Sequence, residues 1–201
     1  MRLFISGSGT GVGKTFFSAL LAKHFHGQGR DVSYIKPVQT GYPADDDAAF
    51  VKSFSGISKA KTLFTAEPPV APCLCFDKFP FEEAVSAIND DSSEVLIVEG
   101  AGGIAVPLDY TRMTWEIPKQ CGLEVIIVVP DRLGCVNEAV LNYSFLTEKA
   151  ISFKGFAMNR HFSETESDTK NAGIIEKLIP ASVIYYFSES LYSKSDETSA
   201  L

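Results

Sequence analysis

The residues best suited to chemistry lie near the start of the chain, where a glycine-rich loop ends in a lysine and a threonine. Residues 7–15 read GSGTGVGKT, after the short apolar run 3–5 and before an amphipathic helical pattern. Glycines let successive backbone N–H groups point into one concavity, and the positive end of the following helix favours a polyphosphate there. Lys14 would reach the terminal phosphates, and the Thr15 hydroxyl would sit on magnesium. The order of strand, loop and helix therefore predicts a phosphate-binding loop.

The spacing of this loop departs from the standard pattern G-x-x-x-x-G-K-[ST]. That pattern needs a glycine at position 8, where this chain has Ser8, and the nearest upstream glycine is Gly7. The loop is one residue longer than the standard form. A glycine-rich turn without a ligand is the plain alternative, but the strand before it and the Gly-Lys-Thr after it favour phosphate binding.

A second lysine, Lys36, follows the β-rich run 32–35 and begins the sequence KPVQTG. A lysine at the exit of a strand, followed by proline, a hydroxyl and a glycine, is placed like a site residue at the carboxyl edge of an open sheet. A solvated lysine before a turn fits the spacing equally well. Three carboxylates come next at 45–47, and they could cap a helix or hold a cation near the phosphates.

A third candidate is Glu99, which ends the apolar run 95–98 and is followed by Gly-Ala-Gly-Gly. A run without polar residues suits the centre of a parallel sheet, where both faces are buried. An acid at the end of such a strand would face the phosphates and could bind magnesium directly or through water. The glycine-rich turn after it makes chance placement less credible than it would be for an isolated acid.

These residues need a sheet to position them, and strand and helix patterns alternate along the chain. A helix is expected after the loop, ending near 27–29, with further helices at 82–88 and 136–149 and strands at 125–129, 156–158 and 183–187. Residues 56–81 contain four prolines and are expected to form an irregular surface excursion. The alternation predicts a doubly wound α/β domain with a mostly parallel sheet and helices on both faces. We expect one domain over 1–187 and a flexible tail over 188–201.

Composition limits the classes of function. The chain has 201 residues, 45% of them hydrophobic and 21% charged, which is ordinary for a globular domain. A net charge of −7 without a basic stripe argues against nucleic acid as a partner. No apolar stretch approaches the roughly 18 to 20 residues that span a bilayer, and no signal peptide is recognisable, so we expect a cytoplasmic protein without a membrane partner. The four cysteines are irregularly spaced and are expected to be free thiols.

Taken together, three separated blocks resemble the dethiobiotin synthetases: GSGTGVGKT at 7–15, KPVQTG at 36–41 and VEGAGG at 98–103. A fourth, LGCVNEAVL at 133–141, is similar to that family's LGCxNHxLL, and the resemblance covers about residues 1 to 160. It implies a fold of the P-loop NTPase type and a homodimer with active sites at the interface. It also implies ATP- and Mg²⁺-dependent closure of the ureido ring of dethiobiotin from 7,8-diaminononanoate and CO₂, through a carbamate and a carbamic-phosphoric anhydride.

The same resemblance implies roles for single residues. Lys36 would hold the carbamate, and Lys14 would span the β- and γ-phosphates of the nucleoside triphosphate. The magnesium ligands would be Thr15, Asp47 and Glu99. Further nucleotide contacts are expected from Gly11, Val12, Gly13, Phe16, Gly100, Ala101, Gly102 and Asn159. Substrate contacts are expected from Thr10, which is also a catalytic candidate, and from Thr40, Gly134, Cys135, Val136 and Asn137, the last four at a helix start that receives the substrate's distal carboxylate across the dimer.

The chain departs from the family pattern near its C-terminal end. Asn159 is followed by Arg160 where the family usually has Asn-Asp, and residues 185–188 replace a Gly-x-Ile-Pro segment that commonly brackets the base. A tyrosine that some members send toward the substrate carboxylate is replaced near Asn171. These departures concern the base and the carboxylate, whereas the phosphate and carbamate residues are intact.

Two other functions share this fold and loop. A nucleotide-driven switch of the partitioning or septum-positioning type normally carries an extra lysine early in the loop, where this chain has Gly9, and often has a membrane or DNA surface. An amidotransferase-like ligase of the cobyrinate kind shares the loop and the strand acid. KPVQTG argues against that ligase, and the chain leaves no room for a glutaminase domain.

Overall fold

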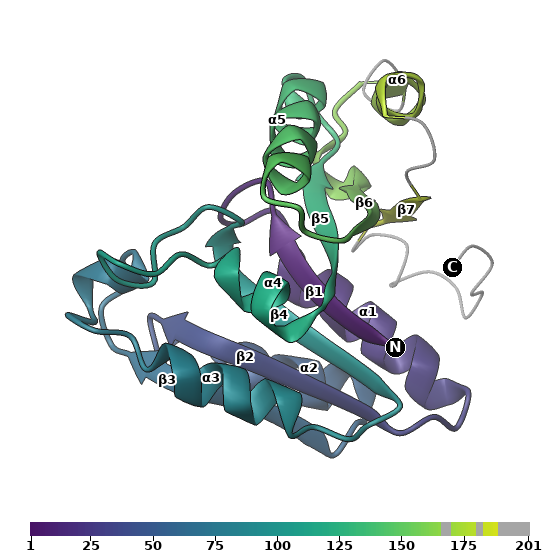
Figure 1. Cartoon of the computed structure of the whole chain (residues 1–201). Helices are drawn as coiled ribbons and strands as arrows, with labels where there is room; N and C mark the ends of the chain where they lie inside the picture. Colours follow the sequence, from purple (N-terminus) through teal and green to yellow (C-terminus); the bar gives the residue numbers. More distant parts are fainter. Residues whose placement is uncertain (166–169, 180–182, 189–201) are drawn as a thin grey trace.

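The computed structural model describes residues 1–165, 170–179 and 183–188, and in these the strands form one parallel sheet with helices on both faces (Figure 1). The strand order is β3-β2-β4-β1-β5-β6-β7. Each neighbouring pair of strands runs parallel. The strands are β1 (Arg2–Gly7), β2 (Val32–Thr40), β3 (Lys59–Ala66), β4 (Val95–Gly103), β5 (Glu124–Pro130), β6 (Phe153–Asn159) and β7 (Val183–Phe187). The predicted doubly wound α/β fold is confirmed.

The helices lie in two layers. Helices α1 (Lys14–Gly27) and α2 (Asp47–Ser55) cover one face, whereas α3 (Phe81–Asn89), α4 (Glu116–Cys121), α5 (Cys135–Glu148) and α6 (Asn171–Leu178) cover the other. Two short 3-10 turns, Pro72–Leu74 and Arg160–Phe162, complete the described elements. Within the described part of the chain, no helix is both long and apolar enough to cross a membrane.

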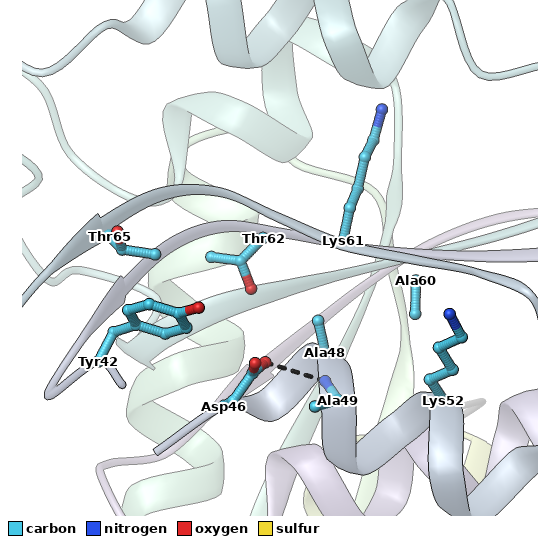
Figure 2. Close-up of a pocket in the computed structure, with 9 residues that line it drawn as sticks. All are labelled: Tyr42, Asp46, Ala48, Ala49, Lys52, Ala60, Lys61, Thr62 and Thr65. Carbon is cyan, nitrogen blue, oxygen red and sulfur yellow. Dashed lines mark hydrogen bonds between the residues drawn. The ribbon is translucent and has the colours of Figure 1, made fainter. Parts of the chain in front are cut away.

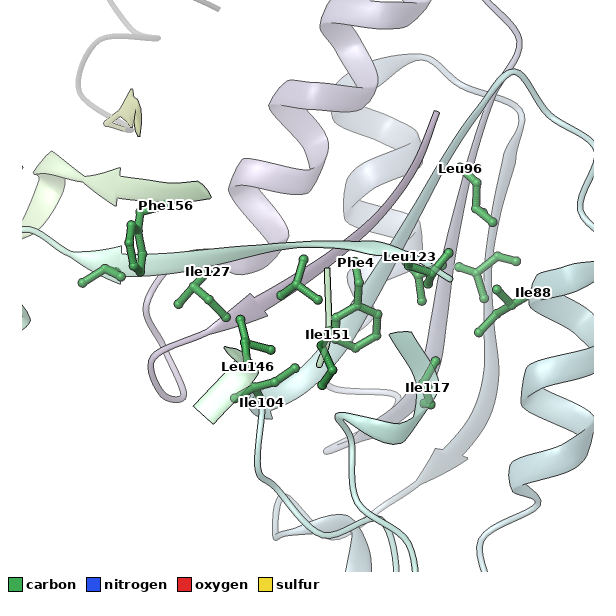
Figure 3. Packing of buried hydrophobic residues seen from close by; sticks show 14 of the residues in the cluster. Phe4, Ile88, Leu96, Ile104, Ile117, Leu123, Ile127, Leu146, Ile151 and Phe156 are labelled. Carbon is green, nitrogen blue, oxygen red and sulfur yellow. The ribbon is translucent and has the colours of Figure 1, made fainter. Parts of the chain in front are cut away.

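Each central strand contributes to two cores because its side chains alternate between the faces. In β4, Leu96 and Val98 point to the α3–α6 side, where they join the cluster drawn in Figure 3, and Val95 and Ile97 join the cluster under α1 and α2. All four side chains are fully buried. This two-sided burial explains why the sequence of β4 reads as an unbroken apolar run.

The expectation of an irregular excursion over 56–81 is wrong for its first part, because β3 forms the edge of the sheet there. Its burial alternates weakly, and Lys59 and Lys61 are exposed, so the strand lacks the apolar signature of its neighbours. All four prolines of the segment lie after residue 67. Charged side chains are a common feature of edge strands because they discourage pairing with another chain.

Strand β2 is longer than its β-rich core, since it continues through Pro37 to Thr40. Pairing with β4 ends at Ile35, and beyond that point β2 pairs with β3, with Lys36 opposite Thr62 and Val38 opposite Phe64. Pro37 therefore costs no ladder bond to β4. Helices α4 and α6 were not expected from the sequence. The predicted tail lies outside the described residues except for Ser188, which is buried.

The strand order indicates where on the sheet a ligand would bind. β1 lies between β4 and β5, so the chain winds toward β2 and β3 on one side and toward β6 and β7 on the other. In open α/β sheets, ligands bind beyond the carboxyl ends of the strands where the winding direction changes. The loop after β1 stands at this switch point.

Candidate functional site

The glycine-rich loop connects β1 to α1 in a conformation that requires glycine at its last position. Gly13 caps α1 with φ 95°, and a Cβ added there would lie 2.5 Å from Asn159 Nδ2. The Asn159 side chain donates a hydrogen bond to the Val12 carbonyl at 3.1 Å and fixes the loop from below. No side chain caps the start of α1. The helix start therefore opens into the loop with its positive end available to a phosphate.

Lys14 folds back across the loop. Its Nζ donates to the Gly9 carbonyl at 3.2 Å, and the residue is only 7% exposed. Burial, assisted by the nearby charge of Lys36, lowers the pKa of Lys14 to about 8, against the opposing pull of Glu99 and Asp47. A lysine held over a loop of amides is placed to meet an anionic group.

Glu99 lies inside β4 and is completely buried, yet its carboxylate accepts four hydrogen bonds. Oε1 accepts from Thr15 Oγ1 at 2.9 Å and from Lys36 Nζ at 2.7 Å. Oε2 accepts from Ser18 Oγ at 2.8 Å and from Tyr34 Oη at 3.0 Å. Complete pairing is what allows a carboxylate to remain in an interior position.

Lys36 bridges two carboxylates. Its Nζ lies 2.7 Å from Glu99 Oε1 and 2.6 Å from Asp47 Oδ2, and the residue is 4% exposed. Burial by itself lowers the pKa of Lys36, but the Glu99 and Asp47 charges outweigh it, so the pKa is raised and the ammonium is retained. The expected position at a strand exit is wrong in detail, because Lys36 lies within β2. The side chain nevertheless points into the site and not into solvent.

The three consecutive aspartates do different work. Asp46 caps α2 by accepting from the Ala49 amide at 2.9 Å, whereas Asp47 turns inward to Lys36. Gln39 holds this turn, since its Oε1 accepts from the Asp47 amide at 3.1 Å and its Nε2 donates to the Asp45 carbonyl at 3.0 Å. Helix capping is thus confirmed for Asp46, and the alternative that these carboxylates hold a cation near the phosphates stays a prediction for Asp47.

The oxygens predicted to bind magnesium come together. Thr15, Asp47 and Glu99 supply one hydroxyl and two carboxylates, and the lysine ammonium already lies against both carboxylates. These are hard oxygen donors with a surplus of negative charge, which suits Mg²⁺ held by one or two carboxylates together with substrate phosphates. Among the described residues, no group of three or more His, Cys, Asp or Glu side chains offers an all-protein metal cage. The donor set fits a magnesium ion shared with a nucleotide.

The start of α5 adjoins the glycine-rich loop. Gly134 caps α5 with φ 96°, and Ser8 Oγ donates to Glu138 Oε2 in the first turn at 2.6 Å. Arg132 Nη2 donates to the other oxygen of Glu138 at 3.0 Å. Cys135 is completely buried, and its backbone N–H already donates to the Arg132 carbonyl at 3.1 Å, so this predicted substrate contact has neither a side chain nor an amide open to a ligand. Val136 and Asn137 follow in the same turn, half-buried and exposed respectively.

The remaining predicted residues lie around this centre. Thr10 approaches the last residues of β4, since its Oγ1 is 3.4 Å from where a Cβ of Gly102 would stand; the glycine-rich turn expected after Glu99 is wrong, because β4 continues to Gly103. Thr40 ends β2 and is half-buried opposite Ala66. The other loop residues with predicted nucleotide contacts are Gly11 and Phe16, on either side of Lys14, and Gly100 and Ala101 at the end of β4.

Asn159, expected near the base, is buried, and its side chain makes two hydrogen bonds. Besides its bond to Val12, its Oδ1 accepts from the His161 amide at 3.1 Å. The Arg160 guanidinium lies 4.0 Å from the centre of the Tyr186 ring. Two of the residues that depart from the family pattern thus pack against each other, whereas Asn171 donates to Asp131 Oδ1 at 3.1 Å.

A separate pocket of about 310 Å³ lies between α2 and β3 (Figure 2). Asp46, Lys52, Thr62 and other small or polar residues line it, and none of the predicted site residues does. The pocket nevertheless adjoins the site in the fold, because Thr62 pairs with Lys36 in the register of β2 and β3 and Asp46 directly precedes Asp47.

Sequence reasoning missed Ser18 and Tyr34, which supply half of the donors to Glu99. Two simple spacings could have found them. Tyr34 precedes Lys36 by two positions in a strand and so shares its face, and Ser18 follows Thr15 by one helical turn. Gln39 was quoted within KPVQTG but received no role.

Comparisons with known proteins agree with this geometry. A family model described as an AAA domain matches residues 1–186. The ATP-dependent dethiobiotin synthetase BioD of Hydrogenobaculum sp. is 33% identical over 193 residues, with 89% of this chain and 86% of the relative covered. That of Haloferax mediterranei is 31% identical over 183 residues, with 87% of this chain and 78% of the relative covered.

Solved structures resemble the chain at much lower identity. A putative plasmid partition protein from Borrelia burgdorferi bound to AMPPNP has a TM-score of 0.60 at 12% identity, covering 98% of this chain and 91% of that chain. The septum site-determining protein MinD of Pyrococcus horikoshii has a TM-score of 0.58 at 14% identity, covering 94% of this chain and 81% of that chain. At such identities the likeness shows the fold alone.

Proposed function

The chain belongs to the family of ATP-dependent dethiobiotin synthetases, and from that premise we propose that it closes the ureido ring of dethiobiotin from 7,8-diaminononanoate, CO₂ and ATP. One amine adds to CO₂ and loses a proton, which gives a carbamate. A carbamate oxygen attacks the γ-phosphorus and ADP leaves, so that a carbamic-phosphoric anhydride forms. The second amine then attacks the carbonyl carbon, loses a proton and expels phosphate.

The observation that carries this proposal is the buried position of Lys36 beside the glycine-rich loop, between Asp47 and Glu99. The carbamate and the triphosphate are both anions, so the reaction needs positive charge fixed where they meet. Lys36 can supply that charge to the carbamate and Lys14 to the phosphates. Neither lysine points into bulk solvent, where water would weaken its effect.

We assign the nucleotide end of the site to the loop and its neighbours. The amides of residues 11–16 cradle the phosphates, and the end of β4 at residues 100–102 closes the other side, with Thr10 next to it. Thr15, Asp47 and Glu99 would hold a Mg²⁺ ion, which when bound supplies neutralising charge to the β- and γ-phosphate oxygens. Asn159 would act near the base chiefly by supporting the loop at Val12.

We assign the diamine end to Thr10, Thr40 and the start of α5. The amides at the start of that helix would receive the substrate's distal carboxylate. We further propose a homodimer whose partner copy contributes this helix start. Support comes from two exposed leucines of this region, Leu133 before the helix start at 90% and Leu141 on α5 at 61%, which leave apolar surface for a partner copy to cover. Chromatography with light scattering tests the dimer, and a monomer at assay concentrations would contradict it.

We also propose that the protein acts in the cytoplasm on small molecules, without nucleic acid or membrane. The net charge of −7 supports this, because phosphate backbones and anionic lipid surfaces attract basic proteins. The competing idea of a nucleotide-driven partitioning switch has only the fold in its favour.

The deciding experiment is phosphate release by the full chain with ATP and Mg²⁺, with and without 7,8-diaminononanoate and bicarbonate. Release should depend on both additions, and mass spectrometry should find one dethiobiotin for each phosphate. Release that is indifferent to the diamine but stimulated by DNA or lipid vesicles would contradict the proposal and favour the switch.

A further inference from the structure

Two buried hydroxyl groups donate hydrogen bonds to Glu99, and the residues that carry them have no role in the proposed reaction. Tyr34, on β2, and Ser18, on α1, are both completely buried. Their hydroxyls donate to the same oxygen, Glu99 Oε2, at 3.0 Å and 2.8 Å. Neither side chain touches the glycine-rich loop through a hydrogen bond of its own.

The four donors divide between the two oxygens of the carboxylate in an orderly way. The pair on Oε2 consists of the two hydroxyls that lie deepest in the core. The pair on Oε1 consists of Thr15 and Lys36, the residues that face the proposed nucleotide and carbamate. A carboxylate oxygen has about two lone pairs, so each oxygen is fully occupied by its own two donors, and the pair on Oε1 is the one that must give way when a metal ion binds there.

The elements that carry the two hydroxyls are fixed relative to β4. Tyr34 is paired with Ile97 in the parallel register of β2 and β4, so the next residue on the same face of β4 is Glu99. Ser18 lies one helical turn beyond Thr15 on α1, which packs on that face. Both donors therefore sit on rigid elements and leave the carboxylate no freedom to rotate.

We propose that Tyr34 and Ser18 are positioning residues that anchor Glu99 through Oε2 and so aim Oε1 at the magnesium ion. Outer hydrogen bonds of this kind orient a ligand before the metal arrives, and their loss typically costs 10- to 100-fold in metal affinity. This inference rests on the proposed function in one respect, which is the assignment of Glu99 as a magnesium ligand.

The test compares Tyr34→Phe and Ser18→Ala with matched controls in the full chain. Tyr185→Phe removes a hydroxyl from a ring that packs on Phe17 of the same helix, and Ser55→Ala removes a buried hydroxyl that donates to a backbone carbonyl on α2. Mn²⁺ affinity is measured by electron paramagnetic resonance in the complex with ADP, and ADP affinity is measured separately in the presence of EDTA.

We expect Mn²⁺ affinity to fall about tenfold in each of the two variants and to stay within about twofold in both controls. ADP affinity without metal should be unchanged. The Mg²⁺ concentration for half-maximal turnover should rise by the same factor, whereas kcat at saturating Mg²⁺ should largely recover. A loss of metal affinity with unchanged metal-free ADP affinity and kcat would distinguish the orientation of Glu99 from a general loss of structure.

Two results would overturn the inference: Mn²⁺ affinity equal to wild type in both variants, or a loss of metal-free ADP affinity as large as the loss for Mn²⁺. Ser18→Ala decides the matter alone if Tyr34→Phe does not fold. Failure of the proposed function appears elsewhere, as wild-type phosphate release that ignores the diamine, and leaves the Mn²⁺ comparison readable.

Discussion

Two buried carboxylates in this protein are held in opposite ways. Glu99 is 0% exposed and Asp109 is 1% exposed. The donors to Glu99 are side chains from α1 and β2, far away in sequence. Three of the donors to Asp109 come from its own turn, namely the Thr111 amide at 2.6 Å, the Thr111 hydroxyl at 2.8 Å and the Arg112 amide at 2.8 Å, and the fourth is the Phe79 amide at 2.7 Å.

The difference separates a site from a structural anchor. Backbone amides cannot leave the carboxylate that they bind without unfolding the turn, so the role of Asp109 is structural. The Lys36 ammonium and the Thr15 hydroxyl are different, because rotation of their side chains breaks their hydrogen bonds to Glu99 and frees them to contact a metal ion or a phosphate. Burial alone therefore does not distinguish the two carboxylates, whereas the nature of their donors does.

The largest expected effect is that of Lys36→Ala. Loss of its positive charge should lower kcat for ring closure about 10²- to 10³-fold, the range seen when one stabilising donor is removed from an active site. Nucleotide affinity should change little, because Lys14 and the loop amides hold the phosphates. Isothermal titration with ADP and a dethiobiotin assay measure the two quantities.

Lys61→Ala is the matched control, since Lys61 lies opposite Ile35 on the neighbouring strand and is exposed. It should leave both quantities unchanged. A collapse of nucleotide affinity in Lys36→Ala would mean that Lys36 is a phosphate residue, and the division of work between the two lysines would be wrong.

Glu99→Gln should weaken Mg²⁺ activation by at least the 10- to 100-fold that is typical when an outer partner of a metal ligand is lost, because here the ligand itself changes. A Mg²⁺ titration of turnover measures the effect. An unaltered titration curve would remove Glu99 from the metal site and erase the contrast with Asp109.

Asp109→Asn should destabilise the protein and spare its chemistry. Burial by itself raises the pKa of Asp109, but the amides of Phe79, Thr111 and Arg112 outweigh it and lower the pKa from 3.8 to about 2. A lowered folded-state pKa contributes stability above the unfolded value, here about 2 kcal/mol, and this stability is lost as the pH falls from about 4 to 2.

Urea denaturation at pH 7 and at pH 2 to 3 tests this expectation, with the exposed Asp77→Asn as control. The difference between wild type and Asp109→Asn should shrink toward the acid end, and kcat of the folded variant should match wild type. A difference in the free energy of unfolding that does not change with pH would show that the hydrogen bonds from the backbone amides do not stabilise the charged form of Asp109.

The smallest effect is expected at a third carboxylate, Glu138, which pairs with Ser8 and Arg132. Its side chain is 26% exposed and that of Arg132 is 48% exposed, and an ion pair so open to water is worth at most about 1 kcal/mol. Glu138→Gln should change turnover only a few-fold in a steady-state assay. A loss comparable to that of Glu99→Gln would show that a carboxylate held by side-chain donors takes part in the reaction even when it is open to water.

Much of the site was readable from the sequence because it depends on short segments. The loop 7–15, the lysine of KPVQTG and the acid after an apolar run each carry their meaning within a few residues, and the alternation of strands and helices places all three at one edge of a parallel sheet. The edge strand β3 was missed because an exposed, lysine-bearing strand lacks the apolar pattern that announces a buried one.

What the sequence by itself determined is therefore the fold class, the phosphate loop and the identity of the charged residues at the rim. Only the tertiary structure decided which donors meet Glu99, that Asp46 caps while Asp47 turns inward, and that Asn159 supports the loop. The Asp46 cap is local, but the other contacts join segments that are distant in sequence and whose relative position is set by strand order and register, here Tyr34 opposite Ile97. A shift of one residue would turn Tyr34 and Lys36 to the opposite face of the sheet.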